Sequence, residues 1–158
     1  MNNKISPFVE PNLDNDSGFL MLRVSKLWEE SHDKALKKHF DITHMQYAVL
    51  ASIQWLILHG QEDVTQISLS KHTKIAPMTV SQALKGLEEK EYVVRAASKV
   101  DMRAKCALLT DKGLSVLNKA FVSIFAADER FFSVISKNRN KFNAYMLELL
   151  QGNDYLSI

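Results

Sequence analysis

The sequence contains little cysteine, glycine or proline and has no long apolar run. Cys106 is the single cysteine, which excludes an intrachain disulfide and suits a reducing compartment. The longest apolar stretch, residues 55–58 and their neighbours, ends at His59 and Gly60, far short of the roughly 20 residues that span a bilayer. The first fifteen residues lack an apolar signal core. We therefore expect a cytoplasmic protein that has no membrane partner.

Net charge is also small, but the charges are unevenly distributed. The formal net charge is +2, yet residues 64–113 contain nine basic and five acidic residues, which leaves the two flanks slightly acidic. A basic centre between acidic ends is typical of a chain in which one part contacts phosphate. A charge difference of this size also arises on solvated surfaces, so it does not identify a nucleic-acid partner by itself.

Motifs for catalysis and cofactor binding are missing. The sequence has no glycine-rich phosphate loop, no nucleophile elbow and no pair of carboxylates that flank a histidine. No two histidines have the i, i+4 helical spacing of a metal site among His32, His39, His44, His59 and His72. We expect no enzymatic activity, no catalytic residue, no cofactor and no metal site.

Helical periodicity dominates the rest of the chain. With 158 residues, 46% of them hydrophobic, the chain can bury one core. Residues 1–15 carry two prolines and no periodicity, which predicts an N-terminal arm that is extended or partly disordered in isolation. Residues 16–42 predict the first part of a dimerisation region, an amphipathic helix with an apolar stripe formed by Leu20, Val24, Leu27, Trp28, Ala35, Leu36 and Phe40.

Residues 43–113 predict a compact lobe that begins with three helices. Thr43 and Gln46 form a capping box for a helix that ends at Gly60. Its expected apolar positions are Tyr47, Leu50, Ile53, Trp55 and Ile57. Two short helices follow at residues 65–74 and 77–90, and Pro77 suits a first helical position. The second of them has a buried stripe at Val80, Ala83, Leu84 and Leu87, which leaves a polar and cationic face of Met78, Ser81, Gln82 and Lys85.

The periodicity changes after Glu91. Residues 92–96 and 106–109 are β-prone, and the charged segment 98–105 separates them, which predicts a two-stranded hairpin. Two short helices followed by a hairpin are the order of a winged helix-turn-helix. Thr110 is expected to cap a long helix, and residues 114–158 to form C-terminal dimerisation helices. The last of these helices has a stripe at Phe142, Tyr145, Met146, Leu149 and Leu150. The expected fold is thus mainly α, with a β wing and dimerisation helices at both ends.

Taken together, these motifs resemble the multiple antibiotic resistance regulator (MarR) family of bacterial transcription factors. Asp101-x-Arg103, followed by Leu109-Thr110-x-x-Gly113, is similar to the wing signature of that family. The paired DNA-binding helices of the family are similar to Thr65-Gln66-x-x-Leu69, Met78-Thr79-Val80-Ser81, Leu84-x-x-Leu87-Glu88 and Tyr92-Val93. The chain departs from many relatives at Ala76, where they have Ser or Asp, and at Gln82, where Arg or Asn is common. The base preference therefore stays open.

The resemblance implies a homodimeric regulator of transcription, most simply a repressor at a pseudo-palindromic operator. In many members a small-molecule effector releases the DNA. The side chains expected to contact DNA are Met78, Thr79, Ser81, Gln82 and Lys85 on the recognition helix, and Lys99, Asp101, Arg103 and Lys105 on the wing. Gln82 suits adenine, and Arg103 suits a narrow minor groove. The family pattern implies that Asp101 orients Arg103, while Lys99 and Lys105 would contact phosphate.

Several alternatives remain open at the level of sequence. A winged helix can also serve as a protein-interaction adaptor, and the charged side chains of the recognition helix and the wing can be solvated surface groups. Cys106 is either a peroxide sensor or, as we expect, a small buried thiol on a wing strand. Four phenylalanines are expected in the core or a dimer interface, with an effector pocket as the alternative, namely Phe121, Phe125, Phe131 and Phe132. The effector, the operator and the direction of regulation are not identified.

Overall fold

The computed structural model describes residues 13–37, 39–98 and 104–153, and it confirms a mainly helical fold with one two-stranded wing. The elements are η1 (Leu13–Asn15), α1 (Ser17–Lys37), α2 (His44–Leu58), α3 (Gln66–Thr73), α4 (Pro77–Glu89), β1 (Val93–Ala97), β2 (Lys105–Leu109), α5 (Asp111–Phe132), η2 (Ser133–Asn138) and α6 (Arg139–Gly152). The expected helices and strands are therefore present, with ends that differ by a few residues.

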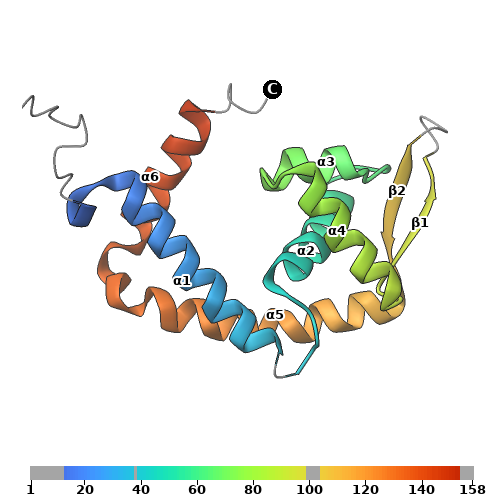
Figure 1. Ribbon diagram of the computed structural model, residues 1–158, viewed down its shortest axis with the longest axis horizontal. Helices are drawn as coiled ribbons and strands as arrows, with labels where there is room; N and C mark the ends of the chain where they lie inside the picture. The colour runs from blue at the N-terminus through green and yellow to red at the C-terminus, as the bar shows by residue number, and fades with distance from the viewer. Residues whose placement is uncertain (1–12, 38, 99–103, 154–158) are drawn as a thin grey trace, which may run out of the picture.

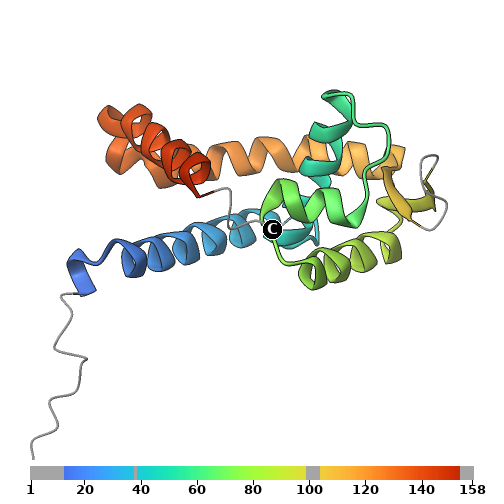
Figure 2. The same cartoon turned by 90° about the horizontal axis from the view of Figure 1, so that it is seen from above.

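Two parts of the molecule are distinct in space (Figure 1). Helices α2, α3 and α4 and the hairpin form one lobe, called here the winged lobe, whereas α6 lies at the other end and α1 runs from that end to the lobe. Helix α5 begins beneath the hairpin and runs the length of the molecule, which the second view shows most clearly (Figure 2). Helix α1 packs along α5, so these two helices carry the winged lobe. We call α1, α5, η2 and α6 the helical arm.

Most of the hydrophobic core lies in the winged lobe, and it extends to Leu36 of α1 and to Leu117, Ala120 and Ile124 of α5. Helix α4 buries the predicted stripe of Val80, Ala83, Leu84 and Leu87. Helix α2 differs from expectation, because Trp55 and Ile57 are exposed and Val49 and Leu56 are buried in their place. Residues 49, 53 and 56 repeat every three to four positions and so share the buried face of the helix, whereas Trp55 lies two positions from Ile53 and points away from it. Ile57 lies at the edge of this face, one residue before the end of the helix, and is 38% exposed.

Threonine side chains define where the helices of the lobe begin. The capping box at Thr43 is confirmed: the Gln46 backbone N–H donates to Thr43 Oγ1 at 3.1 Å, and the Thr43 N–H donates to Gln46 Oε1 at 3.2 Å. Thr65 caps α3 in the same way, with Ser68 as its partner. Thr110 caps α5 as predicted, by accepting a hydrogen bond from the Gly113 N–H at 2.9 Å.

Gly113 has to be a glycine because it lies against another part of the backbone. A Cβ at this position would be 2.0 Å from the carbonyl oxygen of Tyr92, which precedes β1. The Thr110 N–H donates to the same oxygen at 3.1 Å. The Leu-Thr-x-x-Gly motif therefore joins the start of α5 to the base of the hairpin, which places the wing relative to the helical arm.

The helical arm buries much less of its apolar surface than the winged lobe does. No residue of α6 is buried, and its predicted stripe is exposed at Tyr145, Leu149 and Leu150. The backbone leaves helical geometry at Ile135, so α5 and α6 are separate helices joined by η2. Residues 13–15, which we expected in an extended arm, form a 3-10 turn instead, and Asp14 there pairs with Arg23 of α1. No helix within residues 13–37, 39–98 and 104–153 is long and apolar enough to cross a membrane.

Candidate nucleic-acid interface

Contacts from α3 position the start of α4, which is the predicted recognition helix. Lys74 ends α3 in the left-handed conformation, with φ 60°, and turns the chain toward α4. Ser70 Oγ donates to the Ile75 carbonyl at 2.6 Å, and Gln66 Nε2 donates to the Pro77 carbonyl at 3.1 Å. Ala76 stands at the N-cap position of α4 and gives the helix no side-chain cap, because its methyl group cannot accept a hydrogen bond. These two hydrogen bonds therefore tie the first turn of α4 to α3.

The outward face of α4 is narrower than the sequence predicts. Met78 is 73% exposed, and Gln82 and Lys85 are also exposed. Their i, i+4, i+7 spacing places the three side chains in one row along the helix. Thr79 and Ser81 are half-buried, because they lie beside the buried stripe that begins with Val80. Met78, Gln82 and Lys85 are thus the predicted contacts on α4 that are exposed to solvent.

The hairpin is attached to the segment just before α3. Strands β1 and β2 are antiparallel, with Val93 paired to Leu109 and Ala97 to Lys105. The Ala107 N–H donates to the Val64 carbonyl at 2.8 Å, which ties β2 to the lobe. Three of the predicted wing contacts, Lys99, Asp101 and Arg103, lie outside the described residues. Lys105 is described, and it is exposed at the start of β2.

Ion pairs neutralise part of the basic charge of the lobe. Arg95 Nε lies 2.9 Å from Glu88 Oε2, and Lys112 Nζ lies 3.1 Å from Glu91 Oε2. Lys90 contacts both the carbonyl and the carboxylate of Asp41. Lys85 and Lys105 have no acidic partner in the part of the chain that the structure describes. Lys85 on α4 and Lys105 on β2 can therefore meet phosphate, as can the exposed Lys71 on α3.

Cys106 lies in the wing, and the structure confirms that its thiol is buried. Burial raises the pKa of the thiol, and the neighbouring Asp63 carboxylate raises it further. The thiolate is the reactive form of cysteine, and both effects disfavour it. Cys106 is therefore a packing residue of β2.

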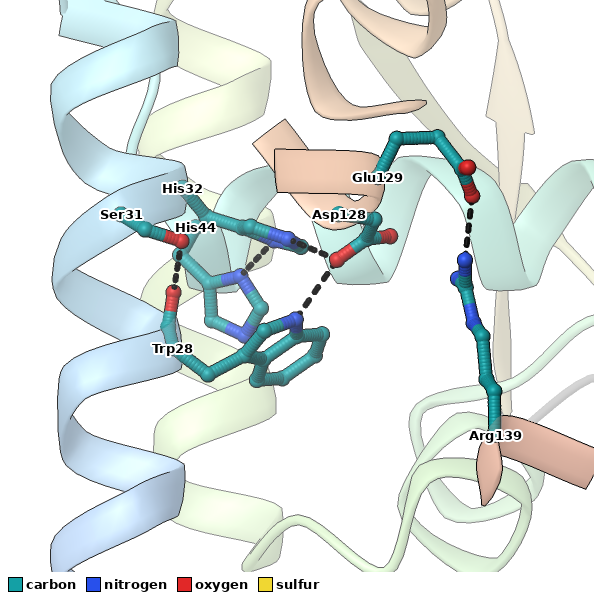
Figure 3. A network of polar contacts seen from close by, with 7 residues as sticks. All are labelled: Trp28, Ser31, His32, His44, Asp128, Glu129 and Arg139. Atoms are coloured by element: carbon teal, nitrogen blue, oxygen red, sulfur yellow. Dashed lines mark hydrogen bonds and ion pairs between the residues drawn. The ribbon is translucent and has the colours of Figure 1, made fainter. Parts of the chain in front are cut away.

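A buried polar cluster joins the winged lobe to the helical arm, and sequence reasoning missed it (Figure 3). His32 of α1 is 2% exposed; its Nε2 lies 2.8 Å from Asp128 Oδ1 of α5, and its Nδ1 lies 3.0 Å from Nδ1 of His44, the first residue of α2. Trp28 Nε1 donates to the same oxygen of Asp128 at 2.7 Å. We call these four residues the junction cluster.

The sequence does contain a signal for the two members of this cluster that lie on α1. His32 lies four residues from both Trp28 and Leu36, so it falls on the apolar stripe of α1, where a histidine needs a buried polar partner. His44 lies twelve residues further along, beyond a turn, and helical spacing does not bring it near. In the described part of the chain, no group of three or more His, Cys, Asp or Glu side chains could hold a metal ion.

An apolar cavity of about 550 Å³ opens between α1, the end of α5 and α6. Its lining includes Leu20, Trp28, Phe132, Tyr145 and Leu149. Of the four phenylalanines considered above, Phe131 and Phe132 line this cavity, whereas Phe121 and Phe125 are exposed on α5. The cavity continues the exposed apolar surface of the helical arm, and Trp28 connects it to the junction cluster.

Comparisons with known proteins agree with this geometry. Residues 42–105 match the family model described as MarR family. The chain is 33% identical over 146 residues to the HTH-type transcriptional regulator YdcH of Bacillus subtilis, and the match covers 92% of this chain and 96% of that protein.

Two solved structures share the fold. The S. aureus MepR–DNA complex is 27% identical with a TM-score of 0.69, over 88% of this chain and 97% of that one. CouR from Rhodococcus jostii RHA1, bound to p-coumaroyl-CoA, is 25% identical with a TM-score of 0.71, over 87% of this chain and 93% of that one. The chain therefore belongs to the MarR family of winged helix-turn-helix transcriptional regulators, which are DNA-binding proteins and not enzymes.

Proposed function

We propose that the protein is a homodimeric repressor that places α4 in the major groove of a pseudo-palindromic operator. The observation that carries this proposal is the exposed row of Met78, Gln82 and Lys85 on a helix whose opposite face is buried. A helix with an exposed row of this kind fits the major groove, where side chains reach base edges. Gln82 can pair with adenine N6 and N7 through two hydrogen bonds, and Lys85 can contact guanine or phosphate.

The half-buried hydroxyls of α4 and the wing complete the proposed interface. Thr79 and Ser81 flank the exposed row and suit phosphate contacts that fix the register of the helix. Lys105 is exposed on β2 and also suits phosphate. The wing signature supports minor-groove insertion by Arg103, orientation of its guanidinium by Asp101 and a phosphate contact by Lys99.

The exposed surface of the helical arm supports a homodimer. Leu20, Val24, Tyr145 and Leu149 are all exposed and border one apolar cavity. A contiguous apolar surface of this kind on a single chain marks an interaction site, and a second copy of the chain would cover it with an identical surface. Two winged lobes would then contact half-sites about one helical turn apart.

Regulation would follow from the spacing of the two lobes. CouR, a structural relative, is bound to p-coumaroyl-CoA, which supports a small-molecule effector for this chain as well. An effector that binds only the DNA-incompetent spacing would release the operator, because a ligand shifts an equilibrium by its difference in affinity for the two states. Occupation of a promoter by the dimer would be the simplest form of repression.

An in vitro selection of duplex DNA by the purified protein tests the interface. We expect a palindrome bound with a Kd of roughly 10⁻⁸ M or tighter, and an affinity that falls steeply with salt. Lys85→Ala should reduce the salt slope by about 1, and Gln82→Ala should relax specificity at one base pair of each half-site. Arg103→Ala should weaken binding by about tenfold or more.

Lys137→Ala is the matched control, because Lys137 is an exposed cation on η2, in the helical arm. Its salt slope should equal that of the wild type. Operator binding would be contradicted if the selection enriched no sequence and if binding were weak and unchanged by Arg103→Ala. That result would favour a protein-interaction adaptor instead.

A further inference from the structure

The junction cluster lies where the winged lobe meets the helical arm. His32 and Trp28 come from α1, Asp128 comes from α5, and His44 is the first residue of α2 (Figure 3). The His44 backbone N–H also donates to Asp33 Oδ1 of α1 at 2.8 Å. The contact between the two imidazoles therefore bridges the first helix of the lobe and both long helices of the arm. A change in this contact would act at the point where the two parts meet.

Only one proton can lie between the two imidazoles. The Asp128 oxygen is an acceptor, so His32 Nε2 carries the proton of that hydrogen bond. With both rings neutral, His44 Nδ1–H donates to the bare Nδ1 of His32. The bond survives one added proton, because one Nδ1 can still donate to the other. A second added proton puts N–H groups on both Nδ1 atoms, 3.0 Å apart, and the hydrogen bond is replaced by repulsion between two cations.

The charged groups around His44 have opposing effects. Burial and the neighbouring His32 lower the pKa of His44, whereas Glu29 and Asp33 of α1 and Asp128 of α5 raise it, and the net shift is downward from 6.5. Lys26 holds the Glu29 carboxylate at 3.1 Å, and Asp33 is engaged by the His44 backbone. Tyr47, the nearby phenol on α2, has its own pKa raised by burial. We call the arrangement in which the two imidazoles are hydrogen-bonded the joined state. This state therefore disfavours the cationic form of His44.

We propose that His32 and His44 form a proton-operated clasp that holds the winged lobe at its DNA-binding angle near neutral pH and releases it on acidification. This inference rests on the operator binding proposed above and adds a regulatory input to it. When the clasp is open, His44 regains its ordinary basicity and binds a proton more readily. The charge of His32 is one cause of the lowered pKa of His44, so that pKa describes the addition of the second proton to the pair. The joined state is thus fully favoured above about pH 6.5, and it loses stability as the pH falls through the lowered pKa of His44 and both Nδ1 atoms become protonated.

The sign of the expected effect distinguishes the clasp from ordinary electrostatics. Acidification adds positive charge to a protein surface, and positive charge strengthens binding to DNA. Release of the clasp would weaken binding, because the two lobes of a dimer would no longer be held at the spacing of the half-sites. A loss of affinity at low pH is therefore opposite to what added surface charge produces.

The first test measures operator affinity at pH 7.5 and pH 5.5 by fluorescence anisotropy. Ionic strength is held constant, and EDTA is present so that no metal ion bound to histidine contributes. We expect wild-type affinity to fall by about fivefold or more at pH 5.5, the size of an ordinary coupling between two sites. In His44→Asn the amide can donate to His32 Nδ1 but does not titrate. Its affinity at pH 7.5 should match the wild type, and it should not weaken at pH 5.5.

His39→Asn is the matched control, because His39 is exposed and outside the junction cluster. It should lose affinity at pH 5.5 as the wild type does. An unchanged or tighter wild-type affinity at pH 5.5, or the same loss in His44→Asn, would overturn the proposal. Absence of operator binding at pH 7.5 would instead contradict the proposed function, and it would leave the clasp itself to the second test.

The second test needs no DNA. Titration of the imidazole resonances by NMR in the free protein should place the His44 transition below 6.5. The indole N–H resonance of Trp28, which reports its hydrogen bond to Asp128, should move together with the His44 transition. The clasp would be overturned by a His44 transition at or above pH 6.5, or by a Trp28 indole chemical shift that stays constant through that transition.

Discussion

The winged lobe and the helical arm are built from similar proportions of apolar residues but use them differently. In the lobe, α2, α4 and the hairpin enclose side chains such as Leu50, Leu84 and Leu87, which are almost completely removed from water. In the arm, α6 buries no residue, and Leu149 is 54% exposed. An apolar side chain stabilises a fold in proportion to the area it removes from water. The lobe is thus complete as a single chain, whereas the arm would gain from a partner surface.

The first prediction introduces a charge into the exposed surface of the arm. We expect Leu149→Glu to weaken dimerisation by about 4 kcal/mol, close to a thousandfold in the dissociation constant, because the carboxylate would be buried without a partner. Sedimentation over a range of protein concentrations measures the effect. Leu58→Glu is the control, because Leu58 is more exposed but lies on α2 in the lobe, and it should leave the dimer intact. Equal behaviour of the two variants would contradict the proposed interface.

The second prediction creates a cavity in the lobe. Leu87 is fully buried in the core between α4 and its neighbours, so Leu87→Ala should lower the free energy of unfolding by about 3–4 kcal/mol. Urea denaturation at several protein concentrations measures the loss. Because this core lies within one chain, the loss should be the same at each concentration. Leu108→Ala, on the exposed side of β2, is the control and should cost about 1 kcal/mol or less.

Sequence patterns predicted the lobe well because its signals are local. Thr43 with Gln46, Pro77 and Thr110 each act within one turn of a helix, so their spacing along the chain determines where the helices begin. The stripe of α4 was also predicted correctly, and it leaves Met78, Gln82 and Lys85 exposed. The predictions for Lys99, Asp101 and Arg103 stay predictions, because these residues lie outside the described part of the chain.

The junction cluster could not be predicted because it depends on angles between helices. His32 and His44 meet only because the chain reverses between α1 and α2, with Asp41 in the left-handed conformation. Asp128 reaches His32 across nearly a hundred residues, through the packing of α5 along α1. Trp55 illustrates the same limit, since its apolar ring suggested a core position and it stacks instead on His59 and His72 at the surface.

The third prediction concerns the connection between the two parts. Gly113→Ala would press a methyl group against the Tyr92 carbonyl, which belongs to the backbone and cannot rotate away, so we expect a loss of about 2–3 kcal/mol. Gly152→Ala provides the matched control, because nothing lies within 4 Å of that position and alanine favours a helix. Thermal unfolding of the two variants separates these effects, and a stable Gly113→Ala variant would contradict the close packing.

The last prediction compares a capped helix of the lobe with an uncapped helix of the arm. Thr43 satisfies the Gln46 N–H and begins α2 beside His44, so Thr43→Ala should cost about 1 kcal/mol. Asn138 stands at the equivalent position of α6 but makes no side-chain cap, so Asn138→Ala should change stability by only a few tenths of a kcal/mol. Thr43→Ser keeps the hydroxyl and should restore most of the loss. If the alanine variants were equally destabilised, the start of α2 would be held by packing alone, and the difference in capping between lobe and arm would have no energetic meaning.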